Sequence, residues 1–294
     1  MRRRPAVAIG LATVLCLTVW AWSVLNTETI EITGGPDYVG GLSGLVVLPD
    51  GSGYTAIGDR NLVVRGQFQR QDGVLTGATV TGVDQMRDWK GRFYVGAWND
   101  AEGLALTADG RLMVSFENQY RVVIFDDALR GTLLPPIPPM GNAAGNAGFE
   151  ALAIDAQGRP VIIMERPVKL PAYTMVFRLE NGDWRRIGNL VRTDRFLATG
   201  ADFGPDGKLY VLERRIGLNG FRSRIRRVDL LDEGLMTGDI VWASHRAHGN
   251  LEGLSVWQAG DGTLRATMVA DDNQLSFLPG GFVEITLAKP AGAD

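Results

Sequence analysis

The sequence predicts an all-β fold, a β-propeller, from three observations: a recurring phrase, its regular pitch, and a hairpin turn inside each copy. The phrase starts at an acidic residue followed by Gly-Leu or Ala-Leu, passes an Asp-Gly or Gln-Gly turn, and ends at a second acidic residue. The two clearest copies run from Glu102 to Glu117 and from Glu150 to Glu165, with identical spacing. Looser copies start near residues 43, 199 and 252. Several short strands repeating every 40–50 residues or so are typical of propellers.

Each copy is expected to fold into four strands, because Asp-Gly between two apolar stretches is a hairpin signal. Residues 173–177 and 224–229 fit the third strand of the third and fourth copies. Five copies predict five blades, although residues 84–98 leave room for a sixth. An alternating strand at residues 29–33 is expected to complete the last blade and close the ring, which removes exposed sheet edges.

The N-terminus carries a targeting signal. Three arginines at positions 2–4 precede an uncharged stretch, residues 5–25, whose helix would be about 31 Å long, close to the thickness of a bilayer core. The basic flank predicts a cytoplasmic N-terminus and a domain outside the cytoplasm, periplasmic or extracellular. We expect an uncleaved membrane anchor, with secretion after cleavage as the alternative. The predicted division is a hydrophobic helical segment over 1–26, a propeller over 27–289 and a tail over 290–294.

Composition excludes several classes of function. The formal net charge is −3, and three of the positive charges lie at positions 2–4, so the exported body is acidic and has no general attraction for nucleic acid. Cys16 is the only cysteine, which leaves that body without a disulfide or a thiol nucleophile. The only histidines, His245 and His248, fit a surface loop better than a metal site. We expect a monomer that binds a small-molecule ester or phosphate ligand and meets the membrane through its N-terminal segment.

Two rings of carboxylates are the main functional signal. The first comes from the starts of the inner strands: Glu102, Glu150 and Glu252, with Asp202 roughly in register and Ser43 replacing the acid. The second comes from the ends of the following strands: Asp59, Glu117, Glu165, Glu213, Asp271 and Asp272. Because the two strands form a hairpin, both rings are expected at one mouth of the channel.

Crowded carboxylates stay ionised together only where a cation or arginines neutralise them. Oxygen ligands without His or Cys select Ca²⁺ or Mg²⁺ over zinc. The rings therefore fit a metal site, direct acid–base catalysis, or a structural device in which glutamates accept backbone N–H groups and lock neighbouring blades.

Arginines accompany these acids. Arg60, Arg166 and Arg214 directly follow acids of the second ring, and they are candidates either to bind a substrate phosphate or carboxylate or to neutralise the ring internally. A broader basic stretch covers residues 185–227, with Arg222, Arg224 and Arg226 alternating on one strand face. We interpret this stretch as a solvated outer face, with a polyanion-binding patch as the alternative.

The chain resembles a known group, the phytase-like domain family, also described as "esterase-like activity of phytase". The resemblance covers roughly residues 38–287 and is carried by Asp59-Arg60, Asp100-Ala101-Glu102-Gly103-Leu104, Ser115-Phe116-Glu117, Glu150-Ala151-Leu152, Glu165-Arg166, Asn250-Leu251-Glu252-Gly253-Leu254-Ser255 and Asp271-Asp272-Asn273. It implies a propeller, export, and hydrolysis of phosphate or carboxylic esters. In calcium-dependent propeller phytases, carboxylates at the channel mouth hold Ca²⁺ ions that bind substrate phosphates. The matching residues here are Glu102, Glu117, Glu150, Glu165, Glu252, Asp271 and Asp272. The chain departs from such sites in having few lysines.

The leading prediction is a membrane-anchored hydrolase of phosphate or other esters that uses Ca²⁺ or another divalent ion at the channel mouth. No catalytic residue is assigned, because the sequence offers no nucleophile–base pair. The alternative is a non-catalytic propeller that binds a ligand or an envelope protein, since a fold does not fix a function.

Overall fold

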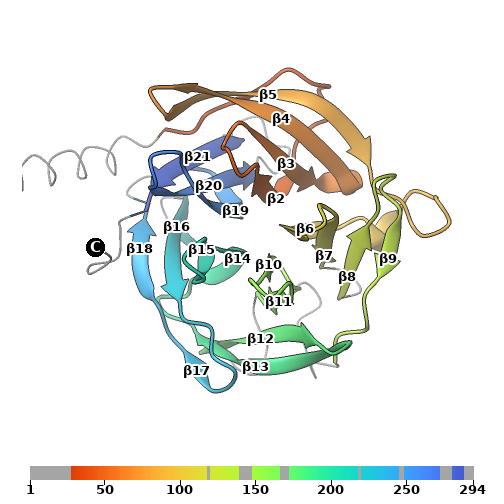
Figure 1. Cartoon of the computed structure of the whole chain (residues 1–294), viewed down its shortest axis with the longest axis vertical. Helices are drawn as coiled ribbons and strands as arrows, with labels where there is room; N and C mark the ends of the chain where they lie inside the picture. Colours follow the sequence, from red (N-terminus) through yellow and green to blue (C-terminus); the bar gives the residue numbers. More distant parts are fainter. Residues whose placement is uncertain are drawn as a thin grey trace, which may run out of the picture.

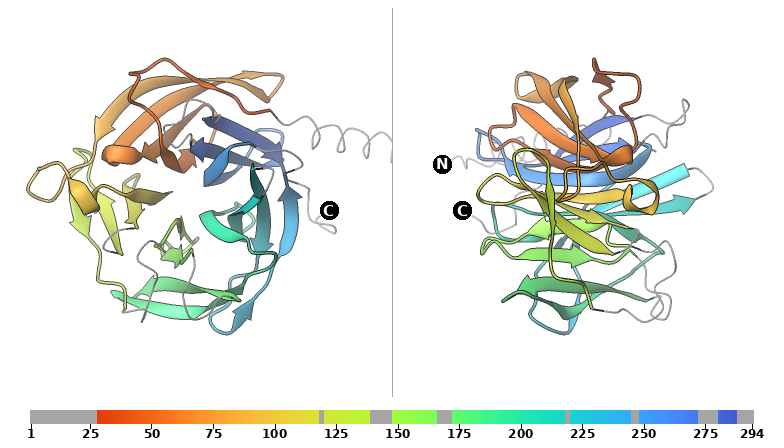
Figure 2. Two further views of the ribbon diagram at one scale, coloured as in Figure 1. Left: turned by 180° about the vertical axis from the view of Figure 1, so that it is seen from behind. Right: turned by 90° about the vertical axis from the view of Figure 1, so that its right-hand side faces the viewer.

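The computed structural model describes residues 28–117, 120–138, 148–165, 172–217, 220–244, 248–271 and 280–287. These residues form five sheets arranged around one axis (Figure 1), so the prediction of a five-bladed all-β propeller is confirmed. Figure 2 shows the same ring from behind and from the side. Within the described ranges, no helix has the length and apolar character needed to cross a membrane. The predicted hydrophobic segment, 1–26, and the tail, 290–294, lie outside them.

Each blade runs from an inner strand next to the channel to an outer strand. Blade 1 contains β2 (Leu42–Val47), β3 (Gly53–Gly58), β4 (Leu62–Gln71), β5 (Val74–Gln85) and, at its edge, β1 (Ile32–Thr33). Blade 2 contains β6 (Ala101–Leu106), β7 (Leu112–Phe116), β8 (Arg121–Phe125) and β9 (Gly131–Leu133). Blade 3 contains β10 (Ala151–Ile154), β11 (Pro160–Ile163), β12 (Tyr173–Glu180) and β13 (Asp183–Val191), with β17 (Leu235–Met236) at its edge.

Blade 4 contains β14 (Leu197–Phe203), β15 (Leu209–Gly217), β16 (Gly220–Val228) and β18 (Asp239–Ala243). Blade 5 contains β19 (Asn250–Gln258), β20 (Leu264–Asp271) and β21 (Gly281–Thr286). The expected third strands of the third and fourth repeats correspond to β12 and β16. The inner strands β2, β6, β10, β14 and β19 contact one another in sequence around the ring. The apolar core fills the spaces between the blades.

The Asp-Gly and Gln-Gly dipeptides form the turns between the first two strands of each blade, as predicted. Their glycines all have positive φ: 70° at Gly51, 84° at Gly110, 75° at Gly158, 73° at Gly207 and 81° at Gly262. A side chain is strained in this region and glycine is not. These tight turns set the hairpin register, so the start of each inner strand and the end of the following strand lie at the same end of the blade.

Residues 84–98 do not form a sixth blade. Strand β5 extends to Gln85, and the chain then follows the outer edge of blade 2, where Arg87 forms bridges with Phe93 and Arg130. A 3-10 turn, η2 (Gly96–Trp98), leads into β6. The extra length of the first repeat therefore lies in a long β4–β5 hairpin and this edge segment.

The N-terminal strand closes the ring in two steps. Ile30 exchanges both backbone hydrogen bonds with Phe282 of β21, at 2.7 and 2.8 Å, so the segment completes the last blade as predicted. Two residues later, β1 pairs in parallel with β5, the outer strand of blade 1. The same short segment thus joins the last blade to the first.

Glycine in the repeated phrase allows the inner strands to approach closely. A Cβ on Gly103 would lie 2.9 Å from the Glu150 carbonyl oxygen of the next blade, and a Cβ on Gly200 would lie 2.3 Å from that of Glu252. Contacts of the same kind face Gly44 and Gly253. Because atoms cannot come this close without a shift, the position after the acid requires a small residue. Blade 3 has Ala151 there.

Hydroxyl side chains join the inner strands of adjacent blades. Ser115 Oγ accepts the Gly103 N–H (3.0 Å) and donates to the Phe149 carbonyl (2.8 Å), which links blade 2 to blade 3. Ser255 Oγ accepts the Val47 N–H across the junction of blades 5 and 1 (3.1 Å). These buried hydrogen bonds fix the blades at the same radius.

Candidate functional site

The acids of the first ring lie at β-bulges. The pairing of the inner strand with the second strand shifts between Leu42 and Gly44, Ala101 and Leu104, Ala198 and Gly200, and Leu251 and Gly253. The bulges therefore contain Ser43, Glu102, Thr199 and Glu252 at equivalent positions, and Glu150 directly precedes β10. A bulge leaves its residue outside the ladder and re-aims its side chain. Three acids, a serine and a threonine thus make up the first ring.

Asp202 does not belong to this ring, in contrast to the prediction, because Thr199 occupies the equivalent position. The Asp202 carboxylate accepts the N–H groups of Val256 (2.7 Å) and Phe203 (2.8 Å). Loss of hydration raises the pKa of Asp202 to about 7. The blade-locking role considered for the ring glutamates is therefore performed by Asp202, between blades 4 and 5.

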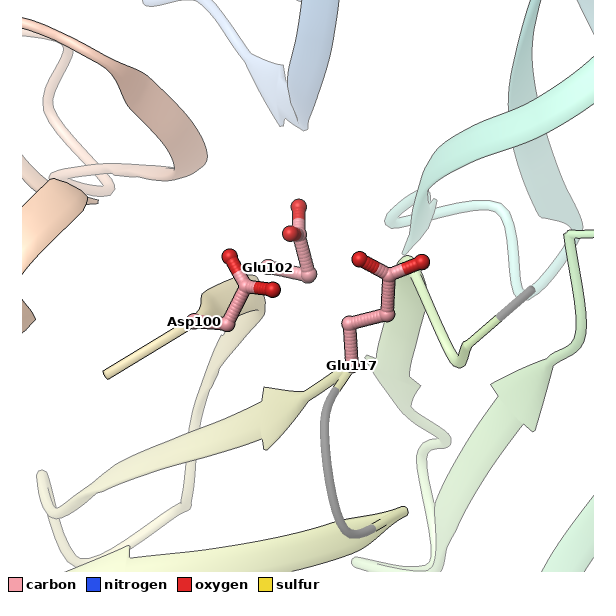
Figure 3. A group of neighbouring side chains, drawn as sticks. All are labelled: Asp100, Glu102 and Glu117. Carbon is pink, nitrogen blue, oxygen red and sulfur yellow. The ribbon is translucent and has the colours of Figure 1, made fainter. Parts of the chain in front are cut away.

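Asp100, Glu102 and Glu117, which we call the acid trio, bring carboxylate oxygens within 4.8 Å of one another (Figure 3). All three come from blade 2: Asp100 precedes β6, Glu102 lies in its bulge, and Glu117 follows β7. Ala101 pairs with Phe116 at the end of the β6–β7 hairpin that lies away from the turn. Next to this pair, the Glu117 N–H donates to the Asp100 carbonyl (3.1 Å). Oxygens on opposite sides of a Ca²⁺ ion with bonds of about 2.4 Å are about 4.8 Å apart. The trio therefore fits one hard cation.

Burial and neighbouring carboxylates raise the pKa values of Glu102 and Glu117. The pKa of Glu117 rises to about 7, first through loss of hydration and then through the neighbouring Asp100 carboxylate. The pKa of Glu102 lies well above its usual range, through loss of hydration and then through Glu252 and Glu150. The Gly148 N–H donates to Glu117 and offsets part of its shift. At neutral pH either protons or a cation must compensate this negative charge.

Glu150 and Glu252 face an arginine instead. Arg214 of β15 donates from Nη1 to Glu252 Oε1 at 2.7 Å, and its Nη2 lies 3.8 Å from Glu150 Oε2. The side chain of Asn250 contacts Arg214 and donates to the same Glu252 oxygen at 2.7 Å. Loss of hydration still raises the pKa of Glu252 to about 7, although Arg214 opposes this. The mouth thus has two halves, the acid trio on blade 2 and an arginine-neutralised half across blades 3, 4 and 5.

The remaining predicted residues lie in different places. Glu165 is buried after β11 and lies near Arg214. Asp271 pairs with Asn250 across β19 and β20, with Asn250 Nδ2 3.4 Å from Asp271 Oδ2. Arg60 is exposed in the 3-10 turn η1 (Asp59–Asn61). Arg166 and Asp272 lie outside the described residues.

Glu213 is held away from the mouth by two buried arginines. Its carboxylate accepts Arg224 Nε at 2.6 Å and Arg226 Nε at 2.8 Å. Arg224 and Arg226 are 2% and 3% exposed, so the interpretation of this strand face as solvated is wrong for both. Their charge compensates Glu213 within the protein.

Sequence reasoning did not assign two residues of the site. Asp100 completes the acid trio, and Asn250 supports Glu252. Both precede a ring glutamate by two residues, and alternation along an extended chain places such positions on one side. That spacing is the signal in the sequence that indicates them.

A cavity of about 480 Å³ adjoins the arginine-neutralised half of the mouth. Glu165 of blade 3 and Arg214 of blade 4 line it together with residues of β15, β16 and the turn before β14. A ligand in this cavity would therefore contact Arg214, the residue that also holds Glu252.

Comparison with known proteins gives a family but no close relative. No curated protein matches the chain. Virginiamycin B lyase from Staphylococcus aureus is 13% identical, with 86% of this chain and 72% of that chain covered and a TM-score of 0.41. A protein of unknown function from Dyadobacter fermentans is also 13% identical, with 83% and 75% covered and a TM-score of 0.44. Likeness at this level says nothing about chemistry.

The family model described as "Phytase-like: Esterase-like activity of phytase" matches residues 37–274. The matched region begins just before β2 and reaches past β20, so it covers most of the five blades and includes the acid trio, Glu150, Arg214 and Glu252. The chain belongs to the phytase-like family.

Proposed function

We propose that the propeller hydrolyses phosphate or other esters and uses a divalent cation, Ca²⁺ in the first instance, at the acid trio. The observation that carries this proposal is the gathering of three carboxylates within 4.8 Å, two of which, Glu102 and Glu117, have raised pKa values. Membership of the phytase-like family supports the reaction class. A bound cation of this kind polarises the ester oxygen and lowers the pKa of an attacking water.

The residues around the acid trio would bind and orient the ligand. Arg214 is held by Glu252 at 2.7 Å and keeps donors that an anionic ester can use. Glu150 lies 3.8 Å from Arg214 and interacts electrostatically with Glu102, and its pKa is raised well above the usual range by loss of hydration and then by Glu165. A carboxyl group with such a pKa can hold a proton at neutral pH and exchange it with a reacting group.

The cellular setting remains part of the proposal. The basic residues at positions 2–4 and the uncharged stretch that follows support a domain anchored to a membrane and working outside the cytoplasm. We further propose that it works as a monomer on a small-molecule ligand.

Turnover tests the hydrolase proposal directly. The full chain is assayed on p-nitrophenyl phosphate and p-nitrophenyl acetate with Ca²⁺, with Mg²⁺ and with EDTA. We expect turnover that requires a cation and that falls at least about tenfold in Glu117→Gln, because a metal ligand is lost. Asp109→Asn is the matched control, since Asp109 lies on the same blade, is 59% exposed and pairs with Arg111. Absence of turnover on both esters with either cation would exclude the hydrolase.

A non-catalytic binding propeller is the second candidate. The pairing of Arg214 with Glu252 and its approach to Glu150 favour it, because this arginine compensates part of the acidic charge within the protein. Cation binding without turnover would support this candidate. A cation at a hundredfold excess over Kd stabilises the folded state by about 2.7 kcal/mol, so melting curves with Ca²⁺ and EDTA detect it without any reaction.

A further inference from the structure

The cavity of about 480 Å³ beside the channel mouth has an excess of positive charge. Its charged lining residues are Glu165, Asp194, Arg195, Arg214, Arg215 and Arg222. They come from the end of blade 3, from the turn before β14, and from the β15–β16 hairpin of blade 4. We call this space the arginine cavity.

Both acids of the arginine cavity have arginines next to them. Asp194 Oδ2 lies 3.4 Å from Arg224 Nη1, and Glu165 lies near Arg214. Within the described part of the chain, Arg195, Arg215 and Arg222 form no ion pair with a carboxylate. Three guanidinium groups therefore border the cavity without an ion pair to any carboxylate of the described residues.

Two of these arginines are placed directly against each other. Arg215 of β15 and Arg222 of β16 are cross-strand partners in the antiparallel hairpin. Like charges directly opposite each other destabilise a hairpin. The Arg215 guanidinium also lies 5.1 Å from the ring centre of Phe196, which orients it. An oxyanion between the two forks would remove this repulsion, because guanidinium groups match phosphate and carboxylate oxygens bidentately.

We infer that the arginine cavity binds a phosphate or carboxylate group, and that the substrate carries this anionic group in addition to the ester that is cleaved. The second part rests on the proposed hydrolase function, whereas the anion site itself does not. Arg214 connects the two places, because it lines the cavity and also contacts Glu252 at the mouth. A ligand that spans them would have its anionic end at Arg195, Arg215 and Arg222 and its ester near the acid trio.

Calorimetric titration of protein stripped of metal ions and then freed of the chelator tests the anion site without any cation or turnover. Inorganic phosphate and succinate are the two probes, and they distinguish a phosphate site from a carboxylate site. We expect the wild type to bind at least one of them, and Arg215→Gln and Arg222→Gln each to weaken that binding about tenfold, the effect of losing one charge-assisted hydrogen bond. Arg185→Gln is the control, because it removes the same charge from a residue outside the cavity. Arg185 lies on β13 and its side chain is 71% exposed.

The outcomes separate the two proposals. Equal binding by all variants, or no binding of either probe by the wild type, would overturn the anion site. Melting curves of the two cavity variants confirm that they are folded, and two substitutions on different strands guard against a local defect. Binding that depends on Arg215 and Arg222 without turnover of any ester would leave the anion site standing and overturn only the hydrolase.

A pair of esters tests whether the anion belongs to the substrate. Mono-4-nitrophenyl glutarate has a free carboxylate, and 4-nitrophenyl butyrate has none. We expect a KM about tenfold lower for the charged ester, and we expect Arg222→Gln to remove that preference while kcat stays unchanged, because the cavity binds the remote end and not the reacting atoms. Equal KM values for the two esters in the wild type would overturn the assignment of the anion to the substrate.

Discussion

Glu117 lies half-buried beside Asp100, and its pKa is raised from 4.5 to about 7, mainly by loss of hydration. The metal-free folded protein therefore keeps a proton on Glu117 that the unfolded chain releases near pH 4.5. This contribution to stability is complete below pH 4.5 and is lost as the pH rises through about 7. A divalent cation would replace the proton above that range.

We expect the free energy of unfolding in EDTA to fall between about pH 5 and pH 8, with Glu117 contributing about 1–2 kcal/mol after allowance for its partial exposure. Urea unfolding across this range measures the fall. Glu117→Gln cannot titrate there and should show a flatter profile, whereas the exposed control Asp109→Asn should follow the wild type. Equal slopes in wild type and Glu117→Gln would contradict the raised pKa.

Glu213 occupies the position of Glu117 in another blade, but it stabilises buried arginines and is not a candidate cation ligand. Its carboxylate compensates Arg224 and Arg226, which are almost completely buried. Removing one partner of a buried ion pair leaves charge uncompensated, so Glu213→Gln should lower the free energy of unfolding by about 3–5 kcal/mol with or without Ca²⁺. Asp229→Asn breaks an exposed pair with Lys208 and should cost less than about 1 kcal/mol. A loss in Glu213→Gln that Ca²⁺ restores would show that Glu213 acts at the metal site instead.

At the scale of elements, the hairpin of inner and second strand brings the first-ring and second-ring positions of its blade to the same end. The positive-φ glycine of the turn fixes the register, and the bulge then directs the first acid out of the ladder. The small residue that follows lets the next blade approach. In blade 2, Gly103 has this role: an added Cβ would lie 2.6 Å from Ser115 Oγ and 2.7 Å from Leu152 Cβ.

Gly103→Ala should therefore destabilise the protein by about 1–3 kcal/mol, since extra atoms in a tightly packed site force neighbouring groups to move. Denaturant unfolding measures the loss. Gly82→Ala in β5 is the control, because a Cβ there meets no atom within 4 Å, and it should leave the free energy of unfolding unchanged or slightly increased. Similar midpoints for both variants would show that the inner strands can separate at no cost.

At the scale of the whole molecule, closure of the ring depends on one short segment. Ile30 bonds to blade 5, and β1 bonds to blade 1, so a defect at Ile30 acts on the junction between the first and last blades. In Ile30→Pro the donor of the 2.7 Å hydrogen bond to Phe282 is lost, whereas Ile30→Ala keeps it.

We expect Ile30→Pro to lower the free energy of unfolding by about 1–3 kcal/mol more than Ile30→Ala, because the Phe282 carbonyl loses its partner. It should also aggregate more readily, since an open ring exposes sheet edges. Urea unfolding and light scattering of the two variants measure these effects. Equal stability of the two variants would show that side-chain packing, and not this pair of hydrogen bonds, stabilises the closed ring.

The sequence by itself determined the propeller and the hairpin that places Glu102 beside Glu117, and it favoured five blades while leaving room for a sixth. These follow from local chemistry, which is Asp-Gly turns and strand alternation, and from the regular pitch of the repeat. It also indicated Glu150, Glu252 and Arg214 as parts of one mouth, because equivalent positions of a repeat meet around an axis.

Only the tertiary structure decided how charge is divided among those positions. Arg214 pairs with Glu252 and lies 3.8 Å from Glu150, each on a different blade from its own, while Asp100 joins Glu102 and Glu117 in a cluster of three carboxylates on blade 2. Thr199 takes the position expected for Asp202, because Thr199 lies in the bulge of β14 and Asp202 lies in its regular ladder. Partners across blades lie tens of residues apart in sequence, and burial sets the cost of each charge, so the pairing of Arg214 with Glu150 and Glu252 cannot be read from spacing along one chain.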